Sequence, residues 1–592
     1  MKVSLETPEL RATQRQPKTS SQQTSFFSQP FGRVGYRSQR IGRLIFLSSG
    51  LLLLIATRLF EIQVIDREQH LSEIYRHKDK TMIEGATGNI LDRERGLLAV
   101  TDSLPTIGAN PGLVDRPRKT ASLLAPILGM SIDSLYDRLT NQQQTYINLK
   151  REVTGEVADQ VRWLDEVGIE IREEKARFYP NGDEFARNLL GQVNIDEEPL
   201  NGIEVQYAHL LSGKAGVRQD YVAARRSIRL PGGDLEYQAA EPGSDLVTTI
   251  HRGTQYFAER TLKNAVDASG ANWGTAVVLD AETAQVLALV DIDRSNEGGS
   301  VGVAAKSSAY IKTFEPGSIS KTFTIAAALE EGRVTPEEIF EIPNTYQFAD
   351  KKYSDPYGGQ QLSVREILAK SSNVGTIQIA ERVGSDQLHS YLRRFGFGQY
   401  SSGNSEAPSL PDESRGKLKV PQRWEGTDLA AISFGQGISV TAIQIAAAYN
   451  VIANDGLYIP PSLVHGTVTP AGSFRPAVVP DGQKVLTAAT VKQMREMLEG
   501  VVVSGTGTKA AVEGYSAAGK TGTAQKPMKD RPGYGDEYTS IFAGFVPAVD
   551  PQITIVVVLD EPDDHSAGRA VAPVFAAIAT ETLATIGVPE TE

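Results

Sequence analysis

The strongest hydrophobic pattern in the chain is near its N-terminus, where LIFLSSGLLLLIAT (44–57) is followed by Arg58 and LFEIQVI. Fourteen uninterrupted apolar or small residues would span ~21 Å as a helix. That is less than the ~30 Å hydrocarbon core of a membrane. The span is long enough if the helix runs from Ile41 to about Ile62, with Arg58 reaching to the outer interface. We therefore predict a single transmembrane helix over residues 44–65.

The charge around this run predicts its orientation. Residues 1–43 carry eight basic and two acidic side chains, a net of +6 against −12 for the whole chain, which leaves −18 for the remainder. Because basic flanks stay in the cytoplasm, we expect a cytoplasmic tail over residues 1–43 and everything after the helix on the outer (periplasmic) face of the inner, cytoplasmic membrane. The alternatives are a cleaved signal peptide and a buried helix. A signal peptide has a short basic region and a small-x-small cleavage site, whereas this tail is long and no such site follows Thr57.

Beyond the predicted anchor the hydrophobic pattern changes at about residue 244. Residues 66–244 mix short strand-like runs with turns rich in Gly and Pro, such as PNGDE and LPGG, and contain no repeat. We predict that they form a separate N-terminal domain without a catalytic pattern of its own.

From residue 245 onward the apolar segments are longer. DLVTTI predicts a strand, Arg252–Val266 an amphipathic helix, and WGTAVVLDAETAQVLALVDI a hairpin with its turn at Asp280–Thr283. YTSIFAGFVPA and QITIVVVLDEP predict two more strands, followed by an Ala-rich helix over Val571–Ile586. Strands at both ends with helices between them indicate an α+β domain, 245–592, in which the first and last strands meet in one sheet.

Composition and charge narrow the possible functions. At 592 residues the chain is too long for one core, and 40% hydrophobic with 22% charged residues is typical of a globular protein. The acidic balance argues against a nucleic-acid partner, because phosphate-binding surfaces are normally basic. The absence of cysteine excludes disulfides, thiolate zinc sites and cysteine nucleophiles. The seven histidines show no metal-pair spacing and neither HExxH nor GxSxG occurs, so we predict no metal site.

A candidate nucleophile lies in FEPGSISKTFTIAAALEEG, where a Pro-Gly turn precedes Ser318 and a helix-forming run follows it. Ser318 and Lys321 are three residues apart, a spacing that places both side chains on one face of a helix. A serine hydroxyl needs a neighbouring base to become nucleophilic, and a lysine made neutral by desolvation can be that base. Free backbone N–H groups in a first helical turn can also stabilise an oxyanion. A second Ser-x-x-Lys, Ser414 to Lys417, lies among Pro and Gly residues and is interpreted as chance.

A second candidate element is AKSSNVG, which supplies Ser371 and Asn373. A hydroxyl two residues from a carboxamide can pass a proton to a leaving group while the amide holds a peptide carbonyl. A similar pair, Ser402 and Asn404, lies in a loop rich in Gly and Ser and is interpreted as a chance match to the pattern.

The third element is AGKTGTAQ, which supplies Lys520, Thr521, Gly522 and Thr523. The pattern suits an edge strand on which a cation and hydroxyls bind a terminal carboxylate, and Gly522 lets a substrate backbone come close. The overlapping GYSAAGKT also satisfies the phosphate-binding loop pattern. That loop must open a helix, whereas GTAQKPMKDRPGYGDEY follows here and is too rich in Pro and Gly, so nucleotide binding is disfavoured.

In the order SxxK, SxN and KTG, these motifs are those of the serine β-lactamases and penicillin-binding proteins. The chain resembles a class B penicillin-binding protein, and within that class the division-specific FtsI type, from the anchor to the C-terminus. The stretches RFYPNGDEFARNLLGQVN, LNGIEVQYAHLLSGKAG and SFGQGISVTAIQIAAAYNVIANDG also match, and EPGS and KSSNVG resemble the septal rather than the elongation type. Two departures lie outside the motifs: Thr87 stands in place of the family's usual arginine in TGNILDRERG, and His251 ends the strand TTIH where LTID is usual.

The resemblance implies a fold and a reaction. The fold is an α+β transpeptidase domain of the penicillin-binding and β-lactamase type, an antiparallel sheet flanked by helices, on an N-terminal pedestal of the dimerisation type. Ser318 attacks the penultimate D-alanine carbonyl of a stem pentapeptide, with Lys321 as base and Ser371 as proton relay. Asn373 orients the donor peptide, and Lys520 keeps Lys321 neutral because two nearby ammonium groups disfavour each other's charge.

The resemblance also implies how substrate is bound. Thr521, Gly522 and Thr523 line the carboxylate site, and the backbone N–H groups of Ser318 and Thr523 form the oxyanion hole. An amine of a neighbouring stem peptide then attacks the acyl-enzyme and forms the cross-link, while β-lactams acylate the same serine. No metal or organic cofactor is implied.

The expected partners are stem pentapeptides, β-lactams, the membrane, other division proteins and a septal glycan polymerase of the FtsW type. The polymerase is expected because nothing before residue 244 resembles a glycosyltransferase. Three alternatives stay open: an elongation-type transpeptidase, a β-lactam-hydrolysing or sensing protein of the same fold, and a scaffold with a vestigial site. A hydrolase needs a dedicated base for deacylation, and a sensor needs an inward-signalling domain, for which a 43-residue tail is too small.

Overall fold

A computed structural model describes residues 37–65, 78–222, 229–295, 299–401, 410, 412–528, 531 and 533–590. The chain divides into two compact units, Met1–Lys80 with Gln219–Glu236 and Thr81–Arg218 with Tyr237–Glu592.

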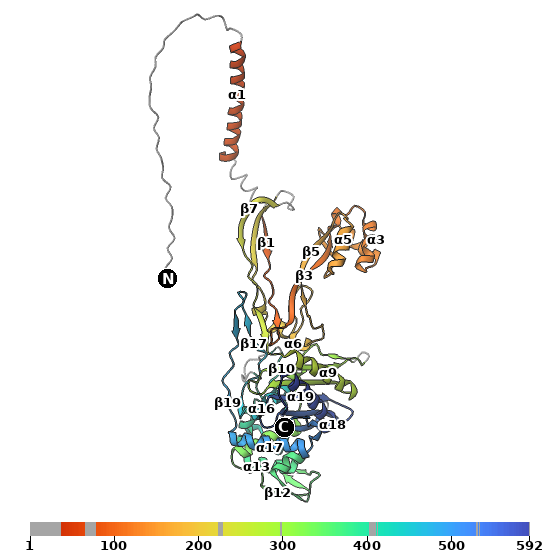
Figure 1. The fold of residues 1–592 in the computed structure, drawn as a ribbon, viewed down its shortest axis with the longest axis vertical. Helices are drawn as coiled ribbons and strands as arrows, with labels where there is room; N and C mark the ends of the chain where they lie inside the picture. Colours follow the sequence, from red (N-terminus) through yellow and green to blue (C-terminus); the bar gives the residue numbers. More distant parts are fainter. Residues whose placement is uncertain are drawn as a thin grey trace, which may run out of the picture. The chain divides into compact units, whose positions relative to one another are not determined.

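The smaller unit contains the predicted membrane helix. Helix α1 (Arg37–Phe60) continues into a π-helical turn, η1 (Glu61–Ile65) (Figure 1). The segment Gly42–Ile65 has 24 residues and a mean hydropathy of 1.8, and none of it is buried. Its leucine, isoleucine and phenylalanine side chains are exposed, which fits a helix covered by lipid rather than by water. The predicted apolar helix is therefore confirmed.

Three strands form a small sheet with the order β1-β6-β7. Their bounds are β1 (Lys78–Ile83), β6 (Gly216–Val222) and β7 (Arg229–Gln238).

The larger unit begins with a small α+β subdomain, which we call the head. Strand β3 pairs antiparallel with both β4 and β5, and three helices pack against them around a core that includes Leu124, Leu128 and Leu135. The elements are β3 (Leu97–Ala109), η2 (Pro111–Leu113), α3 (Pro117–Leu128), α4 (Ile132–Leu139), β4 (Ile147–Lys150), α5 (Gly155–Trp163) and β5 (Ile169–Phe178).

A mixed sheet, the junction sheet, continues from the head. Its order is β18-β17-β8-β2-β3-β4, and β5 pairs with β3. Strands β2 and β8 are parallel, and β17 pairs antiparallel with β8, so the strand predicted from DLVTTI joins segments far apart in the sequence. The additional elements are β2 (Ile90–Leu91), α6 (Arg187–Leu190), α7 (Gly202–Gln206), α8 (Ala208–Leu211), β8 (Asp245–Thr248), β17 (Val464–Val468) and β18 (Phe474–Pro476).

The main sheet has six strands in the order β11-β10-β9-β22-β21-β20, all antiparallel. The β9–β22 pairing, with Val277 opposite Val556, confirms that the first and last strands of the predicted domain meet in one sheet. The predicted hairpin turn is also confirmed, because the Asp280 carboxylate accepts hydrogen bonds from the N–H and hydroxyl of Thr283. The bounds are β9 (Trp273–Asp280), β10 (Val286–Arg294), β11 (Val301–Val303), β20 (Ala518–Pro527), β21 (Tyr534–Val546) and β22 (Ile553–Asp560).

Helices cover both faces of the main sheet, which explains why its central strands are apolar at nearly every position. Val277 faces one core while its neighbours Ala276 and Val278 face the other. The second core takes α9 (Arg252–Ala268) and α19 (Ala572–Ile586), which pack on one another. Both predicted helices are confirmed, with α9 two residues longer than predicted and Val571 acting as the N-cap of α19.

The other face carries the helical middle of the chain. It includes α11 (Ser320–Glu330), α12 (Val364–Lys370), α13 (Asn373–Val383), α14 (Ser385–Arg394), α15 (Asp428–Ser433), α16 (Ala442–Ala453) and α17 (Ala488–Ser504). The smaller elements of this part are α10 (Ser308–Ile311), η3 (Gly317–Ile319), β12 (Ile339–Ile342), β13 (Tyr346–Phe348), β14 (Lys351–Tyr353), β15 (Gln360–Ser363), η4 (Pro421–Arg423), β16 (Leu457–Tyr458) and β19 (Gln483–Lys484). Two more, η5 (Thr508–Ala510) and α18 (Ala567–Ala570), pack against α19 in the second core.

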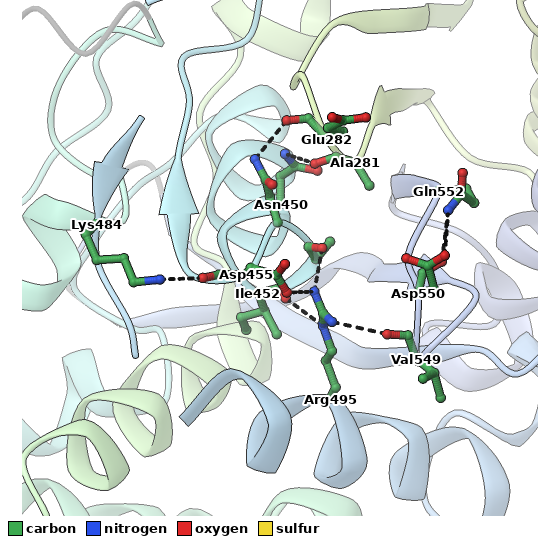
Figure 2. Close-up of polar contacts among 12 residues, drawn as sticks. Ala281, Glu282, Asn450, Ile452, Asp455, Lys484, Arg495, Val549, Asp550 and Gln552 are labelled. Carbon is green, nitrogen blue, oxygen red and sulfur yellow. Dashed lines mark hydrogen bonds and ion pairs between the residues drawn. The ribbon is translucent and has the colours of Figure 1, made fainter. Parts of the chain in front are cut away.

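Arg495 of α17 fixes the position of the buried helix α16 (Figure 2). Its guanidinium donates to the carbonyls of Ile452 (3.0 Å) and Ala453 (2.7 Å) at the end of α16, and to Val549 O (3.1 Å) in the β21–β22 turn. The last carbonyls of a helix have no helical donors, so an arginine can satisfy them. At the same end of the helix, Asn450 donates to Ala281 O (3.0 Å), which ties α16 to the β9–β10 turn.

Candidate active site

The turn that carries Ser318 packs directly against strand β20. Ser318 lies in the short 3₁₀ turn η3, and the α-helix predicted to follow it begins at Ser320. Gly317 has φ +53°, and its N–H donates to Gly435 O (3.1 Å). A Cβ on Gly317 would lie 3.0 Å from Thr523 O, so a glycine lets this turn approach the strand.

Lys321 follows one helical turn later and is completely buried. Its Nζ donates to the carbonyl and to the hydroxyl (3.1 Å) of Ser371. Burial lowers the pKa of Lys321 well below its ordinary value, the nearby charge of Lys520 lowers it further, and Asp355 opposes the shift. This shift favours the neutral form of the Lys321 amine, which is the form that can accept a proton.

Ser318 itself is half-buried. Within the described part of the chain its hydroxyl has no hydrogen-bond partner, and Lys321 donates to Ser371 rather than to Ser318. Hydrogen bonds at catalytic groups are often loose before substrate binds.

The SxN element lies where two helices meet. Ser371 ends α12 in the left-handed conformation (φ 62°, ψ 41°), Ser372 caps α13 by accepting from Gly375 N (2.9 Å), and Asn373 is the first residue of α13. Among the residues that the structure describes, the Asn373 carboxamide makes no hydrogen bond and is half-exposed, so it is available to a ligand.

Asp355 is a site residue that the sequence motifs did not reveal. One of its carboxylate oxygens accepts from Ser372 Oγ (2.6 Å) and Val374 N (3.1 Å), and the other accepts from Tyr357 N (3.0 Å). It therefore holds the loop that presents Ser371. In the sequence it stands in SDPYGG, which reads as an ordinary turn, so only the fold brings it to the site.

The KTG element lies on β20, the edge strand of the main sheet, as predicted. Lys520 is completely buried, its Nζ donates to Thr521 O (3.0 Å), and burial lowers its pKa to about 7. Its charge contributes to the pKa shift of Lys321, and the nucleophile turn packs against β20 at Gly522, so the two lysines lie near one another. The first and third predicted motifs therefore meet, although about two hundred residues separate them.

Thr521 and Thr523, two residues apart on β20, lie on the same face of the strand and differ in exposure. Thr521 is buried and shares a hydrogen bond with Thr506 (2.6 Å between hydroxyls), whereas Thr523 is exposed and donates to His565 O (3.4 Å). A Cβ on Gly522 would lie 2.6 Å from Ile319 Cγ1 and 2.9 Å from Pro316 O. The structure thus requires glycine here for the approach of the protein's own turn, and the approach of a substrate backbone stays a prediction.

A loop from SFGQG supports the nucleophile turn from the other side. A Cβ on Gly435 (φ +87°) would lie 2.1 Å from Gly317 O, which excludes any larger residue. Gly437 N donates to the carboxylate of Glu315 (2.9 Å), which also accepts from Tyr534 OH (3.0 Å). Burial raises the pKa of Glu315.

Two of the three competing motifs have no catalytic geometry. Lys417 lies in an isolated β-bridge with Ser439, and Ser414 caps its own turn by accepting from Gly416 N (3.2 Å), so the second Ser-x-x-Lys has no helix. Ser402 and Asn404 lie outside the described residues. The segment 514–521 runs into strand β20 and not into a helix, which excludes a phosphate-binding loop. No group of metal-ligating side chains occurs among the residues described.

Comparisons with known proteins agree with this geometry. The family model described as the penicillin binding protein transpeptidase domain matches residues 274–580, and that described as the penicillin-binding protein dimerisation domain matches residues 82–248. Penicillin-binding protein PbpB of Mycolicibacterium smegmatis is 31% identical over 98% of this chain and 96% of its own. Peptidoglycan D,D-transpeptidase FtsI of Escherichia coli is 32% identical over 86% of this chain and 84% of its own.

A solved structure extends the similarity to the fold. Penicillin binding protein 3 of Mycobacterium tuberculosis, complexed with aztreonam, superposes with a TM-score of 0.67 at 28% identity, covering 86% of this chain and 98% of the other.

Proposed function

Because this chain belongs to the penicillin-binding protein transpeptidase family, in the class B type that also carries a dimerisation domain, we propose that Ser318 is the nucleophile of its peptidoglycan D,D-transpeptidase activity. The enzyme is a serine-type acyl transferase that cross-links stem peptides and binds β-lactams. Its similarity to FtsI and PbpB, together with EPGS and KSSNVG, supports a role in the septal wall.

One observation carries the assignment of the nucleophile: the lysine one turn after Ser318 is fully buried, and desolvation together with the charge of Lys520 lowers its pKa. A neutral amine takes the proton of the Ser318 hydroxyl as Oγ attacks the penultimate D-alanine carbonyl. The tetrahedral oxyanion is bound by the backbone N–H groups of Ser318 and Thr523. The close approach of the Gly317 backbone to Thr523 supports this assignment, because it brings the nucleophile turn and β20 together.

The second half of acylation moves the proton to the leaving group. Lys321 donates to Ser371 Oγ at 3.1 Å, so the proton can pass through this hydroxyl to the nitrogen of the terminal D-alanine, which leaves as the C–N bond breaks. Asn373 holds the donor peptide, and Thr521 and Thr523 with Lys520 bind its terminal carboxylate. The amine of a second stem peptide then attacks the ester carbonyl, forms the new amide and returns the serine hydroxyl.

The family relationship and the hydrophobic pattern also support an assignment of the parts of the chain. We assign residues 1–43 to a cytoplasmic tail, 44–65 to the membrane anchor, 66–244 to the pedestal and 245–592 to the transpeptidase domain. The enzyme is membrane-anchored, and the basic tail supports insertion in the inner membrane with the catalytic domain in the periplasm. The two family models that match are a transpeptidase domain and a dimerisation domain, so a glycan polymerase of the FtsW type and other division proteins are its proposed partners.

The activity is tested with the full-length protein in detergent, a synthetic stem pentapeptide and an amine acceptor. Release of D-alanine and the cross-linked product are both measured. Ser318→Ala is expected to lose both, whereas Ser414→Ala, the matched serine of the second Ser-x-x-Lys, is expected to keep both. Product formation by Ser318→Ala would contradict the proposal, and turnover of a penicillin within seconds would indicate a β-lactamase instead.

A further inference from the structure

A buried carboxylate outside the catalytic motifs joins the two family domains. Asp291 on β10 is completely buried and accepts hydrogen bonds from Asn188 Nδ2 (2.7 Å), Ser307 Oγ (2.6 Å) and Ala309 N (3.0 Å). Burial raises its pKa to about 6, and these hydrogen bonds, with one from Thr275, oppose the rise. A buried carboxylate is costly unless donors surround it, so the groups that supply them are held firmly.

Asn188 reaches Asp291 from the dimerisation domain, where it lies on the short helix α6. The turn before α6 is anchored by a second, partly buried carboxylate, because Ala186 N donates to Glu259 Oε1 of α9 (2.7 Å). Ala186 is in the left-handed conformation with φ 50°, a strained arrangement that a non-glycine residue adopts only where its surroundings impose it. Two acidic side chains that follow the dimerisation domain in the sequence, Glu259 and Asp291, therefore accept hydrogen bonds from the Ala186–Asn188 turn. These bonds connect the two domains at this point.

On its other side Asp291 holds the start of the segment that leads to the nucleophile. Ser307 and Ala309 begin α10, and the chain then reaches Ser318 through a continuous set of contacts. Phe314 forms a two-way β-bridge with Val440 (3.0 and 2.9 Å), Glu315 accepts from Gly437 N, and Gly317 N donates to Gly435 O. Hydrogen bonds therefore hold Phe314, Glu315 and Gly317 of this segment, and we expect a displacement of its first residues to reach the turn of Ser318.

We propose that Asn188 and Asp291 are a positioning pair through which the dimerisation domain sets the geometry of the nucleophile turn. This inference rests on the proposed role of Ser318. Neither residue touches substrate; both act through the segment 307–317. A force on the pedestal that moves α6 would change the reactivity of Ser318 without any change in the motifs themselves.

The competing explanation is that the pair contributes only stability. Thr248 offers a matched control, because its side chain is also completely buried in the junction sheet and donates one hydrogen bond, to Leu91 O (2.8 Å), without contact to the segment 307–317. Thr248→Val removes one buried hydrogen bond and Asn188→Ala removes two, to Asp291 and to Leu289 O (3.4 Å), so both are expected to lower the unfolding temperature. The two explanations differ in what happens to acylation.

The experiment measures the rate of acylation of the full-length protein by a fluorescent penicillin, together with thermal unfolding. Asn188→Ala is expected to acylate at least about tenfold more slowly, since small displacements of a nucleophile carry large rate penalties. Thr248→Val is expected to acylate within about twofold of the wild type. The inference is overturned if Asn188→Ala acylates within twofold of the wild type, or if Thr248→Val loses acylation to the same extent.

The pH dependence of the acylation rate distinguishes a positioning role of the pair from a general loss of stability. Asn188→Asp places two carboxyl groups at hydrogen-bond distance, where they stay together only if they share a proton. Tyr310 is an ionisable side chain near Asp291, and its pKa is raised by burial and by the Asp291 carboxylate. Relative to the wild type, Asn188→Asp is expected to acylate almost normally near about pH 5.5 and to lose activity towards about pH 8.

A constant ratio across this range would overturn the inference. If the wild type itself carries no label on Ser318, the proposed nucleophile is wrong, and this outcome is distinct from a normal rate in the Asn188 variants.

Discussion

Replacing Gly522 by alanine would add one methyl group at the contact between β20 and the nucleophile turn. The new Cβ would lie 2.6 Å from Ile319 Cγ1 and 2.9 Å from Pro316 O. Ile319 is completely buried in the main core, and the Pro316 oxygen belongs to the backbone. Neither atom can move away without displacing the turn that carries Ser318.

The size of the displacement follows from these distances. Non-bonded carbon atoms settle at roughly 3.5–4.0 Å, so relief of the 2.6 Å contact with Ile319 Cγ1 requires the turn to move by about 1 Å relative to the strand. Overpacking of this kind costs about 1–3 kcal/mol of stability. A shift of about 1 Å at a reacting group can cost about 100-fold in rate. We expect acylation of Gly522→Ala to fall between about tenfold and 100-fold while the protein stays folded.

The assay is the rate of acylation by a fluorescent penicillin, with thermal unfolding measured on the same samples. Gly500→Ala is the matched control, because nothing lies within 4 Å of its Cβ on the surface of α17. It should acylate at the wild-type rate and gain up to about 1 kcal/mol from helix propensity. If Gly522→Ala acylates at the wild-type rate, the packing of the turn against β20 is not what positions the nucleophile.

Three further predictions concern the charged groups of the site. Lys321→Met should reduce the acylation rate by about 10²–10⁴-fold. Its unfolding temperature should equal or exceed that of the wild type, because burying an amine is costly. Acylation at the normal rate would exclude Lys321 as the base. Burial lowers the pKa of Lys520 from 10.5 to about 7, so the unfolded chain binds more protons than the folded protein between these values, and stability should rise with pH across that window. Urea unfolding should show less of this rise in Lys520→Met, and an identical pH dependence in both proteins would contradict the shift. Asp355→Ala removes the acceptor for Ser372 Oγ and Val374 N and should slow acylation by about tenfold through loss of the Ser371 position, which a stopped-flow measurement would test.

The sequence predicted those parts of the fold that depend on local pattern. The hairpin around Asp280, the helices near Arg252 and Val571 and the edge position of the KTG strand are all confirmed, because apolar periodicity and turn residues act over short distances. The pairing of β9 with β22 was also predictable, since strands at both ends of an α+β domain need partners.

What the sequence could not supply depends on tertiary contacts. Asp355 stands in an ordinary turn motif and gains its role only because the chain brings it to Ser372. Gly522 was interpreted through a substrate, yet the atoms nearest to it belong to Ile319 and Pro316. Asp291 gives no signal in the sequence either, since a lone acidic residue in a strand reads as exposed, whereas the fold surrounds it with three donors.

The most direct test of the central claim is to locate the covalent adduct of a penicillin on the full-length protein by peptide mass mapping. The account predicts one penicilloyl group, on Ser318, with the adduct absent from Ser318→Ala and nearly absent from Lys321→Met. An adduct on Ser371, Ser414 or any other side chain would contradict it.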